Sequence, residues 1–194
     1  MSKESLSLNQ AGVEAYRRGD LAGARDAFQK AIQTNSKDLE GVALNRLSLA
    51  RVQQAAGDAE AAHRTLDQVL SSEASPGLRA EAAGRKALLY LAASDLKQAG
   101  EWQGRAQALC DRCRAQGAIL NIGARIALAS GQGALAAQLA GRVLKLPASD
   151  DTRPEQANAQ RILAEAAALP ASVSKAASQP IAQPAIGAPK EAVR

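Results

Sequence analysis

A chain of 194 residues, 46% hydrophobic and 22% charged, is long enough for one globular domain and a tail. Aromatic residues make up only 2%, which argues against a β-sandwich or β-barrel, and one histidine with two cysteines leaves too few ligands for a multi-residue metal site. The net charge of +5, part of which lies in the C-terminal segment, is a mild bias that does not predict nucleic-acid binding, which usually shows a concentrated basic stripe. No apolar run is long enough to span a membrane.

Four short turn sequences recur along the chain at nearly constant spacing. They are Gly19-Asp20, Gly57-Asp58, Ser94-Asp95 and Gly131-Gln132, at intervals of 38, 37 and 37 residues. Five residues after the first member of each stands an alanine: Ala24, Ala62, Ala99 and Ala136. Seven residues before it stands another small residue: Gly12, Ala50, Ala87 and Ala124. The repeat predicts two antiparallel helices joined at each turn, with small residues where the helices cross.

The helical spacing of apolar residues places these helices. It predicts four pairs, at 4–18 with 21–34, 39–56 with 59–72, 77–93 with 95–112, and 115–130 with 133–146. A ninth helix follows, in which Thr152 and Glu155 have the spacing of a capping box. Its single apolar stripe is expected to cover the last pair. The proline-containing segment 170–194 has few large apolar side chains and predicts a disordered tail, so that the domain spans 1–169.

The first helix pair resembles the tetratricopeptide repeat (TPR) family. Its matching residues are Gly12, Tyr16, Gly19, Asp20, Ala24, Phe28 and Ala31. The second and fourth pairs follow the same pattern, whereas the third has Ser94 in place of glycine and Gln103 in place of a bulky apolar residue. The resemblance covers about residues 5–146 and implies an all-α, right-handed α-solenoid of four helix hairpins plus a C-terminal capping helix. The repeat of 37–38 residues exceeds the family's 34, and the family's closing proline is absent.

The resemblance also implies a concave groove, lined by the first helix of each pair, that holds a peptide or helix. The corresponding positions are Asn9, Val13, Tyr16, Leu47, Arg51, Leu88, Leu91, Asn121, Arg125 and Leu128. Several of them would alternatively belong to the core between repeats. Because an unpaired buried charge is costly, we expect Arg51 and Arg125 to be exposed in the groove or paired with a carboxylate.

No set of residues has the spacing of a catalytic site, so neither enzyme activity nor a cofactor is expected. His63 is interpreted as a surface or inter-helix residue, and carboxylates such as Asp67 and Glu81 are expected on solvated faces. Cys110 and Cys113 allow three interpretations: inert thiols, a structural disulfide if the helix ends between them, or a redox or metal site. The last is disfavoured because the dipole at a helix C-terminus opposes a thiolate.

The resemblance, together with the lack of a catalytic pattern, implies a non-enzymatic scaffold that binds a peptide or helix of another protein. The alternatives are a periplasmic carrier for an apolar small molecule such as a lipid, and a secretion-type chaperone. No nucleic-acid partner is expected. A cytoplasmic location is expected if Met1 is the native start, and the alternative is a periplasmic protein or outer-membrane lipoprotein whose signal sequence is absent from this chain. The excess of arginine over lysine and the abundance of alanine indicate a bacterial source.

Overall fold

The computed structural model describes residues 2–34, 36–110, 112–150 and 152–169, and within these ranges it contains nine helices and no strand. The helices are α1 Lys3–Arg17, α2 Leu21–Thr34, α3 Leu39–Ala55, α4 Ala59–Leu70, α5 Pro76–Ala92, α6 Leu96–Leu109, α7 Gln116–Ala129, α8 Gly133–Leu144 and α9 Arg153–Ala168. All four expected pairs and the ninth helix are confirmed. The largest difference is at the end of α6, which stops at Leu109 instead of residue 112. The tail expected at 170–194 lies outside the described residues.

Each hairpin turn is made by one residue in the left-handed backbone conformation. These residues are Gly19 (φ 80°), Gly57 (φ 80°), Ser94 (φ 61°) and Gly131 (φ 70°). In the first turn the amide of Asp20 donates to the carbonyl of Ala15 (2.9 Å), which is the bond that ends a helix in a Schellman motif. The Oδ1 atom of Asp20 then accepts from the amide of Gly23 (2.8 Å) and caps the next helix. The glycine therefore ends one helix and the aspartate begins the next.

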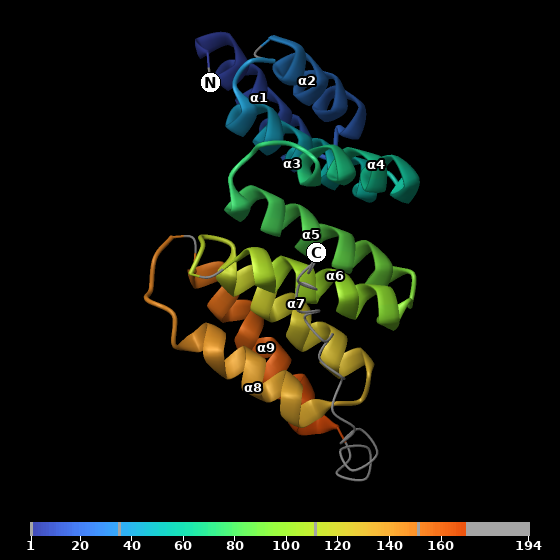
Figure 1. Cartoon of the computed structure of the whole chain (residues 1–194), viewed down its shortest axis with the longest axis vertical. Coiled ribbons are helices and arrows are strands. Elements are labelled where there is room, and N and C mark those ends of the chain that lie inside the picture. Colours follow the sequence, from blue (N-terminus) through green and yellow to red (C-terminus); the bar gives the residue numbers. More distant parts are fainter. Residues whose placement is uncertain (1, 35, 111, 151, 170–194) are drawn as a thin grey trace, which may run out of the picture.

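Small side chains allow the helices of a pair to pack closely. The alanines that follow each turn are buried, and so are the small residues that precede it. A Cβ atom added to Gly12 would lie 2.8 Å from the ring of Phe28, so α1 and α2 could not approach as they do if a side chain stood there. Figure 1 shows the hairpins stacked one after another, from α1 and α2 at one end to α8 at the other.

Helix α9 packs against α7 and α8 and covers the last hairpin. Ala159 and Ile162 of its apolar stripe are buried in one cluster with Ala140 and Val143. The capping box expected at its start is wrong. Thr152 has a helical backbone (φ −92°, ψ −26°), and its Oγ1 donates to the carbonyl of Pro147 (2.7 Å) instead of accepting a bond from the helix.

The two cysteines lie in the connection between α6 and α7. Cys110 leaves the helical conformation (φ −120°, ψ 84°), because α6 ends one residue before it. The Cα atoms of Cys110 and Cys113 are 5.2 Å apart, and the structure joins the two sulfur atoms in a disulfide. Of the three arrangements considered for this pair, the structure has the disulfide. Cys110 is buried against Ala80 and Ala83 in the first half of α5.

Candidate functional site

The first helices of the hairpins form one face of the solenoid, and a row of hollows follows this face from α1 to α9. We call this row the groove. The N-terminal hollow (≈ 430 Å³) is lined from α1, α3 and α5 and by Phe28 of α2. The middle hollow (≈ 760 Å³) is lined mainly from α3, α5 and α7, and the C-terminal hollow (≈ 490 Å³) from α5, α7 and α9. Arg51 and Arg85 line both the N-terminal and the middle hollow. Leu88 and Glu155 line both the middle and the C-terminal hollow. Each hollow therefore adjoins the next along this face.

Most of the residues expected in the groove lie beside these hollows. Val13, Tyr16 and Arg51 line the N-terminal hollow, and Leu88 and Arg125 line the C-terminal hollow. Arg125 also borders an adjoining hollow of ≈ 440 Å³, whose lining includes Leu91 and Leu128. Arg51 and Arg125 are both exposed, as the cost of burying an unpaired charge predicts.

Leu47, Asn121 and Asn9, which were expected in the groove with the core between repeats as the alternative, make contacts within the protein. Leu47 is only 2% exposed and belongs to the core between repeats. Asn121 borders the C-terminal hollow but is 4% exposed, and its Nδ2 donates to the backbone oxygen (2.8 Å) and to Oε2 (2.7 Å) of Glu155. Asn9 donates to Oδ1 of Asn45 (2.8 Å). The Nδ2 groups of these two amides join α1 to α3 and α7 to α9, whereas Oδ1 of Asn121 is buried without a hydrogen-bond partner among the described residues.

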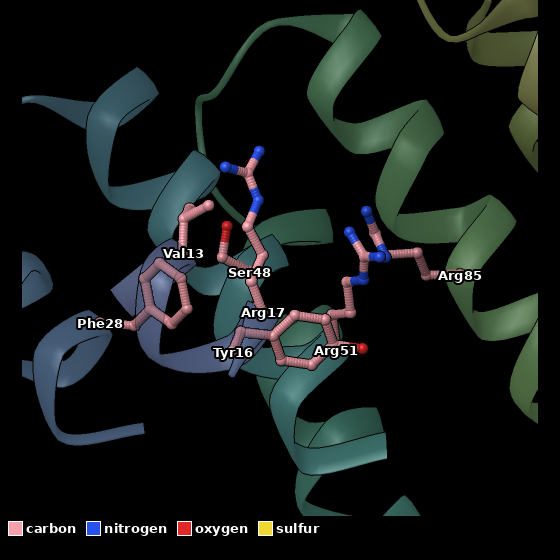
Figure 2. A pocket seen from close by; sticks show the side chains of 7 residues that line it. All are labelled: Val13, Tyr16, Arg17, Phe28, Ser48, Arg51 and Arg85. Carbon is pink, nitrogen blue, oxygen red and sulfur yellow. The ribbon is translucent and has the colours of Figure 1, made fainter. Parts of the chain in front are cut away.

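The N-terminal hollow brings together three arginines from three successive first helices. Figure 2 shows Arg17 of α1, Arg51 of α3 and Arg85 of α5 around this hollow, with Arg51 and Arg85 extending toward one another. The guanidinium of Arg51 lies 4.8 Å from the ring centroid of Tyr16. Arg85 donates from Nη2 (2.7 Å) and Nε (3.2 Å) to Oε1 of Glu81 on its own helix.

Charges in the rest of the groove are mixed. The middle hollow carries Glu40, Glu81 and Glu155 beside its arginines, and the C-terminal hollow carries two arginines and two glutamates. Glu40 accepts from the amide (2.6 Å) and the hydroxyl (3.0 Å) of Ser75, and so ties α3 to the start of α5. Among the described residues, no carboxylate lines the N-terminal hollow. Positive charge is therefore concentrated at that end.

Arg85 was not among the expected site residues, although a signal for it exists in the sequence. Arg17, Arg51 and Arg85 follow one another at intervals of 34 residues, which is shorter than the spacing of the turns. They stand two, six and nine residues before the hairpin-turn residues Gly19, Gly57 and Ser94. Each arginine is therefore about one turn of helix further from its hairpin turn than the arginine of the preceding hairpin. Arginines at this spacing lie on the same face of successive helices.

A second polar cluster lies outside the groove, between α4, α5 and α6. Lys86 is 5% exposed, and its Nζ is 2.5 Å from Oδ1 of Asp67 and 4.2 Å from the ring centroid of Trp102. Asp67, expected only on a solvated face, thus pairs with a buried cation. His63 packs on Tyr90 with ring centroids 4.7 Å apart, and burial, followed by the charge of Lys86, lowers the pKa of His63 below 6.5. The cluster joins the second hairpin to the third.

The described part of the chain contains no group of three or more metal-ligating side chains. Of the helices described, none has the length and apolar character needed to cross a bilayer. Large hydrophobic side chains that remain exposed include Leu44, which lines the middle hollow, and Leu135 on α8. Leu44 adds an aliphatic contact to the groove.

No protein-family model and no curated protein matches this sequence. Solved structures do match its fold. The nearly identical TPR-like repeats of a putative kinesin light chain from Podosopora anserina superpose with a TM-score of 0.57 at 19% identity, over 90% of this chain and 100% of that one. A tetratricopeptide repeat protein from Parabacteroides merdae gives a TM-score of 0.55 at 14% identity, over 83% of this chain and 60% of that one.

The chain has a TPR-like fold. The helix hairpins and their stacking, which the sequence resemblance implied, are confirmed. At these identities the likeness concerns the fold. The function is therefore argued from the groove itself.

Proposed function

We propose that this TPR-like protein is a non-enzymatic scaffold that binds an extended or helical segment of another protein along its groove. The row of adjoining hollows carries the proposal, since neighbouring hollows share Arg51, Arg85 and Leu88 in their linings. A segment lying across them would meet aliphatic side chains that bury its apolar residues. It would also meet charged side chains that set its orientation, which is the usual arrangement of a peptide-binding groove.

The alternative of an apolar small-molecule carrier is less well supported by the same hollows. Every hollow of the groove has at least one arginine or glutamate in its lining. A lipid chain placed there would remove water from these charges without offering them partners, and the desolvation would cost several kcal/mol. A protein segment has backbone amides, carbonyls and side chains that satisfy them. A secretion-type chaperone would bind its client through the same contacts.

Site-specific photo-crosslinking tests the proposal. A photoreactive phenylalanine analogue replaces Leu44, which lines the middle hollow, and in a matched control it replaces Leu135, an exposed leucine on α8 outside the groove. Both variants are irradiated in cells of the source organism, and crosslinked proteins are identified by mass spectrometry. We expect one protein to crosslink at Leu44 and not at Leu135 and, once purified, to bind the unmodified chain.

Two results would contradict the scaffold function. Equal crosslinking at Leu44 and Leu135 would mean that the groove has no special affinity for protein segments. A lipid that copurifies in native mass spectra, and that is displaced by substitutions of groove leucines, would favour the carrier.

The disulfide supports the alternative of an oxidising compartment over the cytoplasm, because disulfides persist mainly outside reducing compartments. We propose that Cys110 and Cys113 are oxidised in the native protein. Alkylation of freshly isolated protein in denaturant measures this directly. No reactive thiol is expected, and two reactive thiols would place the protein in a reducing compartment.

A further inference from the structure

The disulfide and a longer α6 exclude one another. In a regular α-helix the Cβ atoms of residues three apart are about 5–6 Å from each other, whereas a disulfide requires about 3.5–4.5 Å. The apolar spacing of the sequence predicts a helix over 95–112, but α6 ends at Leu109, one residue before Cys110. The bond from Cys110 to Cys113 is therefore possible only because the helix stops there.

Arg112, which lies between the two cysteines, has a left-handed backbone conformation (φ 58°). This conformation is sterically unfavourable for a residue with a Cβ atom, so it persists only where the surrounding structure imposes it. A helix continued past Cys110 would remove the steric cost and gain one backbone hydrogen bond for each added residue. The connection between α6 and α7 therefore has two competing conformations, which we call looped and helical, and the disulfide is compatible only with the looped one.

The two sulfur atoms of the disulfide differ in their access to solution. Cys110 is 6% exposed, in a cluster with Ala106 and Ile119, whereas Cys113 is partly exposed. A thiolate from solution therefore reaches Cys113 first. The dipole at the end of a helix opposes a thiolate at Cys110, the C-cap of α6, so this residue takes up a proton on reduction and remains as a buried neutral thiol.

The residues that follow Cys113 form part of the wall of the middle hollow. Arg114 and Ala115 line this hollow, and so does Gly77 of α5, where an added Cβ atom would lie 3.8 Å from Cβ of Cys113. If α6 continued to residue 112, three residues would remain before α7, which is within the usual length of a helix–helix connection. Arg114 and Ala115 would then have to reverse the direction of the chain, and this wall of the groove would change shape.

We propose that Cys110 and Cys113 form a reversible redox site that controls the middle hollow. The disulfide holds the looped conformation, and its reduction by a dithiol donor allows α6 to extend into the helical one. The conformational change is independent of the proposed function, whereas its effect on binding rests on it.

The reduction is a pair of thiol–disulfide exchanges. A thiolate of the donor attacks Sγ of Cys113 and forms a mixed disulfide, while Sγ of Cys110 leaves and takes up a proton. The second thiolate of the donor then attacks the donor's own sulfur atom in the mixed disulfide. Cys113 leaves and takes up a second proton, so the chain gains two electrons and two protons, and the donor loses them and becomes a disulfide.

A redox titration with two substitutions at one position tests the coupling between the disulfide and the helix. The folded chain is equilibrated with graded ratios of reduced and oxidised dithiothreitol, and its free thiols are counted by alkylation and mass spectrometry. The parent is compared with Arg112→Gly and Arg112→Ala. Both substitutions remove the arginine side chain and its contacts, but glycine accepts the φ of 58° and disfavours a helix, whereas alanine does neither. Arg112→Ala is therefore the matched control.

We expect Arg112→Gly to raise the equilibrium constant for disulfide formation about tenfold, since it removes the steric cost of the looped form and weakens the helical one. Arg112→Ala should stay within about threefold of the parent. On reduction of the parent, the ¹³Cα NMR signal of Arg112 should move to a helical position, and the amide of Cys113 should become protected from hydrogen exchange. The variant Cys110→Ser/Cys113→Ser should resemble the reduced parent in both signals.

Two results would overturn the redox site as a switch. An Arg112 signal that is the same in the oxidised and reduced chains would mean that the connection does not change its conformation. Equal effects of Arg112→Gly and Arg112→Ala on the disulfide equilibrium would mean that the backbone of Arg112 does not oppose the disulfide.

The effect on the groove is measured by repeating the photo-crosslinking at Leu44 in the Cys110→Ser/Cys113→Ser chain. The crosslinked yield should fall at least threefold, because Leu44 lines the hollow whose wall changes. An unchanged yield beside a changed Arg112 signal would refute the control of binding and leave the scaffold function intact. A parent chain that does not crosslink at Leu44 would refute the scaffold function, while the Arg112 signal still decides the conformational switch.

Discussion

Removal of the charge of Asp67 should destabilise the protein more than removal of its buried partner. Lys86 is almost fully buried between three helices, with its Nζ 2.5 Å from Oδ1 of Asp67. The substitution Asp67→Asn keeps the size of the side chain but leaves an ammonium group without its counter-charge. Lys86→Met removes the ammonium and keeps an unbranched chain of similar length over Trp102.

The magnitude follows from the exposure of the two side chains. Breaking a fully buried ion pair by removing one partner costs about 3–5 kcal/mol, and an exposed pair contributes about 1 kcal/mol or less. The side chain of Lys86 is 6% exposed but that of Asp67 is 56% exposed, so water partly replaces the lost carboxylate. The ring of Trp102 also continues to stabilise the cation. We expect Asp67→Asn to cost about 2 kcal/mol, and Lys86→Met less than about 1 kcal/mol.

Urea denaturation followed by far-UV circular dichroism measures both substitutions and their combination, at pH 8 so that His63 is neutral. In the Lys86→Met background, Asp67→Asn should cost less than about 0.5 kcal/mol, because the ammonium group that the carboxylate of Asp67 neutralises is then absent. The reasoning is refuted if Asp67→Asn alone leaves the free energy of unfolding unchanged. It is also refuted if Lys86→Met is the more damaging substitution, since packing of the lysine chain would then outweigh the buried charge.

Three further predictions concern pH, packing and the third turn. Burial lowers the pKa of His63 below its unfolded value of 6.5, so the unfolded chain binds this proton more readily than the folded chain. The contribution of neutral His63 to the free energy of unfolding is therefore present above pH 6.5 and is lost as the pH falls toward the lowered pKa. His63→Gln should remove this part of the pH dependence of unfolding. Gly12→Ala should destabilise by about 1–3 kcal/mol in thermal melts, because the new Cβ would lie 2.8 Å from Phe28, whereas Gly104→Ala, with open space around it, should stabilise by about 0.5–1 kcal/mol. Ser94→Gly should stabilise by about 0.5 kcal/mol, because Ser94 has a φ of 61° that glycine adopts without steric cost.

Each of these has a contrary result. An unfolding free energy with the same pH profile in His63→Gln and the parent would mean that His63 is not the titrating group. Equal changes in melting temperature for Gly12→Ala and Gly104→Ala would mean that α1 and α2 can move apart without loss of stability. A less stable Ser94→Gly would mean that the serine side chain contributes more than its backbone conformation costs.

Helix positions and turns could be predicted from the sequence because they depend on neighbouring residues. The left-handed φ of Gly19 and the capping bond of Asp20 involve only a few residues on either side. The same holds for Ser94, whose place in the repeat identified it as a turn residue although it is not glycine. The capping box at Thr152 is the local exception, since the threonine hydroxyl is taken by the loop before it.

The groove could be predicted only in part. Val13, Tyr16, Arg51 and Arg125, all on first helices of their hairpins, lie beside its hollows. Leu47 could not be assigned to the core from the repeat alone, because burial depends on how far each helix is rotated about its own axis.

What the sequence determined by itself was therefore the series of hairpins, since their turns, caps and small-residue crossings are set by contacts within one repeat. The tertiary structure decided which polar side chains meet: Lys86 with Asp67, and Asn121 with Glu155. Each of these encounters joins different helices, and it depends on the rotation and offset between them. Spacing along the chain therefore could not predict these contacts, and packing between hairpins decided them.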